Sequence, residues 1–95
     1  MSQRLDFTVT RLRSLAARGC RAEDLLEHVV SCLGSELAPL TFIAALREAF
    51  GVPLVVIRDA AEGWAGLNRA GCDIPTDVVV GVLAPYIDQF LETIE

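Results

Sequence analysis

Residues 39–50 have the sequence PLTFIAALREAF, and this stretch decides the fold. Thr41, Arg47 and Glu48 are its only polar residues apart from the backbone, so a helix here is apolar around most of its circumference. Such a helix is usually central and buried. Pro39 fits the first helical turn, where its missing N–H group costs nothing. We therefore predict a central buried helix at about residues 39–50.

Amphipathic segments lie on both sides of this helix. Residues 5–18 and 21–33 each place their apolar side chains on one helical stripe. Residues 76–94 show the same pattern, interrupted at Pro85, which either kinks one helix or begins a new one. The sequence therefore predicts an all-α fold, a compact bundle of five to six short helices around the central one.

Two segments also fit a β-strand. Residues 52–58 are rich in β-branched side chains, and residues 5–10 alternate between apolar and polar. We favour helix in both, because no partner strand is evident. A helix from about 54 to 62 would place Leu54 and Val56 on the apolar side, opposite Arg58.

Ninety-five residues are enough for one domain and too few for two cores. We predict a single helical domain over 1–95, in which a Gly-rich loop occupies about 63–75. This loop contains Trp64, the only tryptophan. Its ring either folds back as a lid over the core or anchors an interface.

The charge is distributed unevenly along the chain. The predicted basic N-terminal helix, residues 1–21, has five arginines and one aspartate, a net charge of +4. The acidic helical body, residues 22–95, has three arginines and twelve acidic residues, a net charge of −9. Either the basic segment packs on the acidic body of its own chain, or one of the two surfaces serves a partner.

These features favour a small acidic protein–protein interaction module. It would act on a basic partner as an inhibitor, an immunity-type protein or an adaptor, and it would form a homo-oligomer. We predict that it is not an enzyme, because one histidine and no lysine leave few general bases. The candidate partner-binding residues are Asp24, Glu27, Asp88, Glu92, Trp64, Arg4, Arg11 and Arg13.

Two other functions stay open. A nucleic-acid-binding regulator would use the Arg-rich N-terminal segment, although the acidic body would repel phosphates. A thiol enzyme would use Cys20, which precedes a predicted helix N-terminus between Arg18 and Arg21, an environment typical of reactive thiols. No base for such a thiol is evident, which makes this the weaker alternative.

We predict no metal and no cofactor. His28 and Cys32 are four residues apart on one helix and could join Cys20 and Cys72 around a zinc ion, but the spacing has no zinc signature. The odd number of cysteines and the lack of an apolar signal-peptide core at the start point to a cytoplasmic protein. No apolar run approaches the roughly 20 residues that a membrane span needs.

Overall fold

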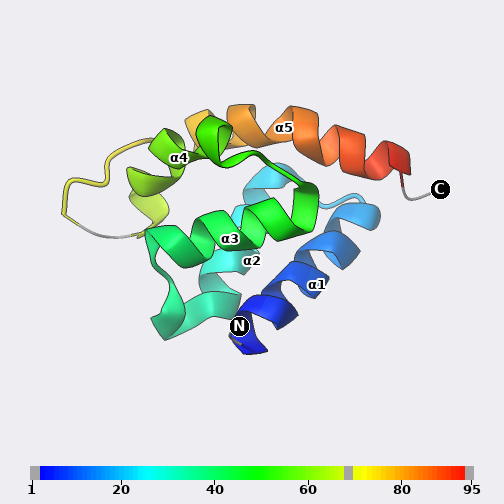
Figure 1. Ribbon diagram of the computed structural model, residues 1–95, viewed down its shortest axis with the longest axis horizontal. Coiled ribbons are helices and arrows are strands. Elements are labelled where there is room, and N and C mark those ends of the chain that lie inside the picture. The colour runs from blue at the N-terminus through cyan, green and yellow to red at the C-terminus, as the bar shows by residue number, and fades with distance from the viewer. Residues whose placement is uncertain (1–2, 68–69, 94–95) are drawn as a thin grey trace.

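The computed structural model describes residues 3–67 and 70–93, and this part of the chain is helical. Five α-helices and two short 3-10 turns account for its regular structure (Figure 1). Their bounds are α1 Gln3–Ala17, α2 Ala22–Leu33, η1 Gly34–Glu36, α3 Pro39–Phe50, α4 Leu54–Glu62, η2 Ala65–Leu67 and α5 Thr76–Thr93. The predicted all-α bundle is therefore confirmed.

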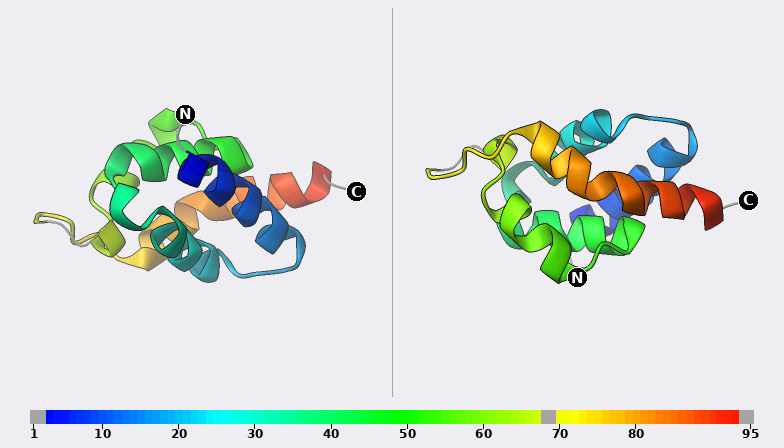
Figure 2. Two further views of the ribbon diagram at one scale, coloured as in Figure 1. Left: turned by 90° about the horizontal axis from the view of Figure 1, so that it is seen from below. Right: turned by 90° about the horizontal axis from the view of Figure 1, so that it is seen from above.

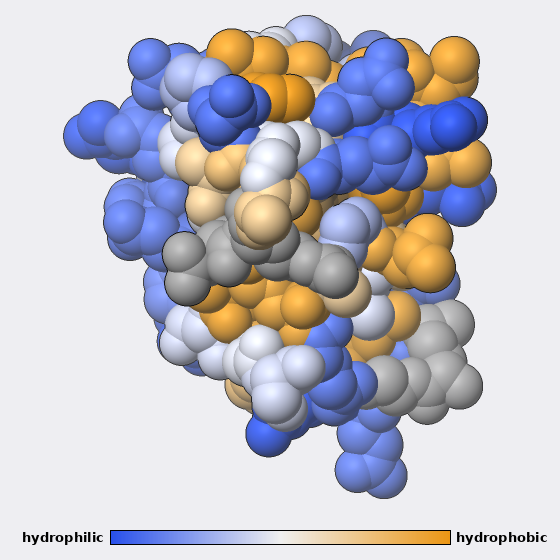
Figure 3. Space-filling view, turned by 90° about the vertical axis from the view of Figure 1, so that its left-hand side faces the viewer, coloured by the Kyte–Doolittle hydropathy of each residue, from blue (hydrophilic) through white to orange (hydrophobic). Residues whose placement is uncertain are grey.

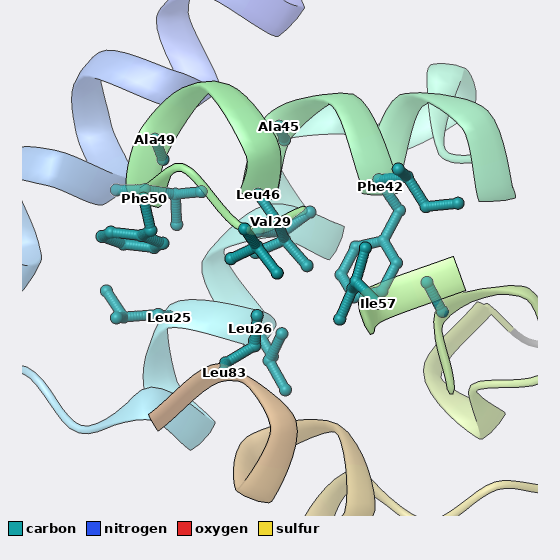
Figure 4. Close-up of a cluster of buried hydrophobic side chains, with 14 of the residues drawn as sticks. Leu25, Leu26, Val29, Phe42, Ala45, Leu46, Ala49, Phe50, Ile57 and Leu83 are labelled. Atoms are coloured by element: carbon teal, nitrogen blue, oxygen red, sulfur yellow. The ribbon is translucent and has the colours of Figure 1, made fainter. Parts of the chain in front are cut away.

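Helix α3 lies at the centre of the bundle and contacts each of the other four helices (Figure 1). Side chains from α2, α4 and α5 meet those of α3 in the core, among them Val29, Ile57 and Leu83 (Figure 4). The prediction of a central buried helix is confirmed. The buried residues of α3 are Phe42, Ile43, Ala45, Leu46, Ala49 and Phe50.

Both segments that also fitted a strand are helical. Residues 5–10 belong to α1, where Phe7 lies off the buried stripe and is 59% exposed. The N-terminal helix is shorter than the predicted range of 1–21, of which residues 1 and 2 lie outside the described residues. It ends at Ala17, because Gly19 has a φ of 91° and turns the chain towards α2.

Residues 52–58 enter α4 at Leu54. Pro53 precedes this helix with an extended backbone, and the N–H groups of Val56 and Ile57 donate to its carbonyl. The prediction of helix is therefore confirmed here as well. The one bridge of β type in residues 3–67 and 70–93 joins Trp64 to Ile74.

Helix α5 continues through Pro85, so the two C-terminal segments form one helix. A proline inside a helix removes one hydrogen bond and crowds the carbonyl four residues earlier. That residue is Gly81, which is exposed and has no atoms within 4 Å of an added Cβ position. Because residue 81 is a glycine, it adds no side chain to this crowding.

The Gly-rich loop joins α4 to α5 and lies at one end of the molecule (Figure 2). It has the predicted extent of about 63–75 and contains the η2 turn, while residues 68 and 69 lie outside the described part. No helix in residues 3–67 and 70–93 has the length and apolar character needed to cross a membrane.

Candidate interaction surfaces

Trp64 lies in the core rather than on the surface, with 3% of its surface exposed. Its ring stacks on Phe42 at a centroid distance of 4.7 Å. Its Nε1–H donates a hydrogen bond of 3.1 Å to Thr76 Oγ1, which satisfies the one polar atom of the indole. Of the two alternatives, this is the lid over the core, and the ring presents almost no surface to a partner.

Two of the three candidate arginines bind carbonyl groups of their own chain. Arg13 Nε donates to the carbonyl of Ala49 at 3.1 Å, and its Nη2 donates to that of Glu48 at 2.6 Å. These carbonyls belong to the last turn of α3, whose carbonyl groups lack helical partners and carry partial negative charge. Arg13 therefore joins α1 to the end of α3.

Arg4 holds α1 to the end of α2. Its Nη1 donates to the carbonyl of Leu33 at 3.0 Å, and its Nε lies 3.6 Å from Glu36 Oε2. Gly34 beside it has a φ of 53°, in the left-handed region that favours glycine, and a Cβ at this position would also displace the end of the Arg4 side chain. The basic segment thus packs partly on its own chain, through backbone carbonyls more than through the acidic side chains that we expected.

Arg11 differs from both. It is exposed, and it forms no hydrogen bond or ion pair within the described part of the chain. It borders an open groove of about 700 Å³ between α1 and α2, which we call the α1–α2 groove. The groove is lined by Arg4, Phe7 and Arg11 from α1 and by His28, Ser31 and Cys32 from α2.

The four candidate acidic residues all point into solvent. Asp24 and Glu27 lie on α2, and Asp88 and Glu92 lie on α5. None forms an ion pair with another described residue. Helices α2 and α5 pack together, so the two acidic pairs belong to neighbouring helices. Like charges at these spacings cost a helix about 0.2–0.5 kcal/mol. Asp24 lies in the first turn of α2, where the helix dipole favours a negative charge, whereas Asp88 and Glu92 lie in the C-terminal half of α5 without that support.

Sequence reasoning missed an exposed apolar surface on α4. We expected Leu54 and Val56 on the buried side of α4, yet both are exposed, and Val55 is 86% exposed. These three residues form what we call the α4 outer face. Figure 3 views the end of the molecule near α4 and the Gly-rich loop, and it shows hydrophobic groups at the surface among hydrophilic ones.

The reason for the exposure is that only one narrow stripe of α4 reaches the core. Ile57, Ala60 and Ala61 are its buried residues. Beside the α4 outer face, Leu54, Val55, Arg58 and Asp59 enclose a depression of about 350 Å³. The signal in the sequence was Val55, which shares its side of the helix with Arg58 and Asp59.

The three cysteines are free and partly buried. Cys72 donates a weak hydrogen bond from its sulfur to the carbonyl of Glu62 at 3.3 Å. Residues 3–67 and 70–93 contain no group of three His, Cys, Asp or Glu side chains placed to hold a metal ion. The expectation that the chain is not an enzyme stays a prediction.

Comparison with protein families, with curated proteins and with solved structures found no match for the chain. The surfaces on which the chain could bind a partner are the α4 outer face, the acidic sides of α2 and α5, and the α1–α2 groove.

Proposed function

We propose that the chain is a protein-interaction module that binds a basic partner protein through the α4 outer face. The observation that carries this proposal is the exposure of Leu54, Val55 and Val56 on one turn of α4. Removing apolar surface from water contributes about 25 cal/mol per Å². A partner that covers these side chains gains this free energy, and adjacent exposed apolar side chains are typical of interaction sites.

A basic partner fits the charges around this face. The carboxylate of Asp59 borders the depression beside Leu54 and Val55, and it forms no ion pair with the described residues. A partner with an apolar side chain next to a lysine or arginine would fill the depression and pair with Asp59. Arg58 is already close to Glu62, at 3.7 Å, and competes little for Asp59.

The acidic pairs of α2 and α5 would act at longer range. Residues 22–95 have a net charge of −9, and opposite charges on two proteins increase the rate of encounter more than they increase affinity. We expect charge reversal of Asp88 and Glu92 to lysine to slow association with a basic partner and to weaken its salt dependence. The same change at Asp24 and Glu27 provides the comparison, measured by stopped-flow or surface plasmon resonance.

The direct test uses the tagged protein to isolate its partner from cells that express it. We expect the Leu54→Ser, Val55→Ser double variant to lose the partner while its circular dichroism spectrum stays unchanged. Leu40→Ser is the matched control, because it also removes an exposed apolar side chain but lies on α3, outside both proposed binding surfaces. Equal recovery with the double variant and the wild type would contradict the proposal.

The partner itself would distinguish an inhibitor or immunity-type protein from an adaptor. If the partner is an enzyme or a toxin, its activity in the presence of the wild type and of the double variant shows whether binding inhibits it. A partner whose activity does not change on binding would instead indicate an adaptor.

Self-association belongs to the same proposal, because residues 1–21 and 22–95 have opposite net charges that a second copy can match. Light scattering at micromolar concentration, at low and at high salt, measures it. A species of 10.3 kDa at both salt concentrations would remove self-association from the proposal.

The nucleic-acid alternative has a test of its own. Arg4 and Arg13 are already bonded to carbonyls of the chain, which leaves Arg11 as the free cation among the three candidates in the described part. We expect no measurable binding to duplex DNA or RNA at physiological salt. Micromolar affinity that falls steeply with salt would favour the regulator instead.

A further inference from the structure

We infer that the α1–α2 groove binds an acidic peptide segment of a partner protein. The segment would carry a hydrophobic residue about 6 Å from a carboxylate, the rise of four residues along a helix. This site goes beyond the proposed function, because it lies on other helices than the α4 outer face and selects the opposite charge.

The apolar part of the site is Phe7. The core does not need this ring, since the buried stripe of α1 runs through Leu5, Val9 and Leu12 and leaves Phe7 59% exposed. A large aromatic ring half in water at the edge of a groove is a ready anchor for an apolar side chain.

The cationic part is Arg11, one helical turn after Phe7 on the same side of α1. Its guanidinium makes no ion pair or hydrogen bond within the described residues, although the chain as a whole is acidic. A guanidinium binds a carboxylate with two parallel hydrogen bonds. Phe7 and Arg11 together therefore select a hydrophobic residue and a carboxylate at the matching separation.

The other wall of the groove supplies neutral polar groups and a fixed position. His28 and Ser31 line it from α2, and neither side chain has a hydrogen-bond partner in the described part of the chain. Both can bond the backbone or side chains of a bound segment. Arg4 holds the two helices together at one end of the groove by its bond to Leu33, so the groove exists before a ligand arrives.

The shape favours a peptide over a small molecule. Small-molecule sites bury roughly 70–90% of the ligand's surface. The α1–α2 groove holds about 700 Å³ but is open to solvent along its length, so a small anion here would stay mostly in water. A helical or extended segment lying along two helices covers itself and the groove together, as in helix-in-groove recognition.

The test is a titration of the ¹⁵N-labelled protein with two synthetic peptides, followed by NMR. The first peptide is an alanine-rich 16-mer with Leu and Glu four residues apart in two repeats, and the second has Gln in place of each Glu. We expect the Glu peptide to shift the amide signals of Phe7, Arg11, His28 and Ser31, with an affinity about five- to tenfold higher than that of the Gln peptide.

Variants assign the effect to individual side chains. Arg11→Gln should abolish the preference for the Glu peptide, and Phe7→Ser should weaken both peptides alike. Arg18→Gln is the matched control, because it removes the same charge at an exposed position outside the groove and should leave the preference intact. Val55→Ser should also leave peptide binding unchanged, which separates this site from the α4 outer face.

Four results would overturn the assignment. Equal affinities for the Glu and Gln peptides would show that Arg11 does not bind the peptide carboxylate. Equal effects of Arg11→Gln and Arg18→Gln would show that the preference comes from the net charge of the protein and not from a contact with Arg11. If acetate shifts the same amide signals to saturation and the Glu peptide binds no more tightly than acetate, the groove is a small-anion site. Shifts at these four residues on concentrating the protein alone would assign the groove to a second copy of the chain.

Discussion

Helices α3 and α4 follow each other in the chain and are both rich in apolar residues, but they use them differently. Helix α3 contacts every other helix and buries six side chains. Helix α4 packs mainly against α3 and α5, buries three side chains and leaves Leu54, Val55 and Val56 in contact with water. The difference shows that apolar content alone does not decide how much of a helix becomes core, because an apolar side chain is buried only where another part of the chain covers it.

The N-terminus of α3 shows the same rule within one helix. Leu40 is 81% exposed, although it is two residues from the fully buried Phe42. The start of α3 is instead fixed by polar bonds, because the hydroxyl of Thr41 accepts from the Ala38 N–H at 2.9 Å and donates to the Glu36 carbonyl at 2.7 Å. Apolar residues outside the packed faces of these two helices therefore do not contribute to the core, and they are available to contact a partner.

The largest expected effect is the loss of stability in Phe42→Ala. The ring is fully buried and stacks on Trp64, so its removal leaves a cavity in the centre of the core. We expect a loss of about 3–5 kcal/mol in the free energy of unfolding, measured by urea denaturation. The control is Leu40→Ala on the same helix, which should change stability by less than about 0.5 kcal/mol. Similar losses in the two variants would break the contrast between buried and exposed positions.

A smaller loss is expected where the Gly-rich loop supports the lid. In Gly66→Ala the new methyl group would overlap the Trp64 ring, which must then move from its stack on Phe42. We expect this variant to lose about 1–3 kcal/mol. Gly81→Ala is the opposite case, because its methyl group meets no atom within 4 Å and a helix gains about 0.5–1 kcal/mol from alanine. Thermal unfolding of both variants measures the difference in sign.

The helices could be predicted from the sequence because the apolar residues in most of these segments recur at the spacing of a helix. The stripe through Leu25, Leu26, Val29 and Leu33 predicts α2 and its buried side directly. The break at Pro85 was ambiguous, because proline predicts a disturbance whether or not the helix continues. Only the structure shows that the helix continues through Pro85.

The surfaces were harder to predict than the helices. A side chain on an amphipathic helix is buried only if another helix covers it, and the sequence does not say which helices touch. Leu54 and Val56 share the apolar side of α4 with Ile57, but neighbouring helices cover only Ile57. Likewise, nothing local distinguishes Arg13, which binds the end of α3, from Arg11, which has no hydrogen bond or ion pair among the residues that the structure describes.

This difference between two arginines of one helix can be measured. Arg13→Gln removes two hydrogen bonds to the last carbonyls of α3, and we expect a loss of about 1 kcal/mol in the free energy of unfolding. Arg11→Gln removes no bond within the described part of the chain and should leave stability unchanged. Urea denaturation of the two variants side by side tests this, and an equal loss in both would mean that charge rather than bonding stabilises α1.

The smallest expected effect on stability is at the α4 outer face. Val55→Ala removes two methyl groups that are already in water, so the free energy of unfolding should change by less than about 0.5 kcal/mol. Ile57→Ala, two residues away on the same helix, empties a fully buried position and should lose about 2–5 kcal/mol. If Val55→Ala is as destabilising as Ile57→Ala, the face is covered in solution even without a partner, as it would be in a homo-oligomer. We expect Val55→Ala to leave the free energy of unfolding unchanged and to lower the recovery of the partner. This result would mean that the methyl groups of Val55 contribute to binding and not to stability.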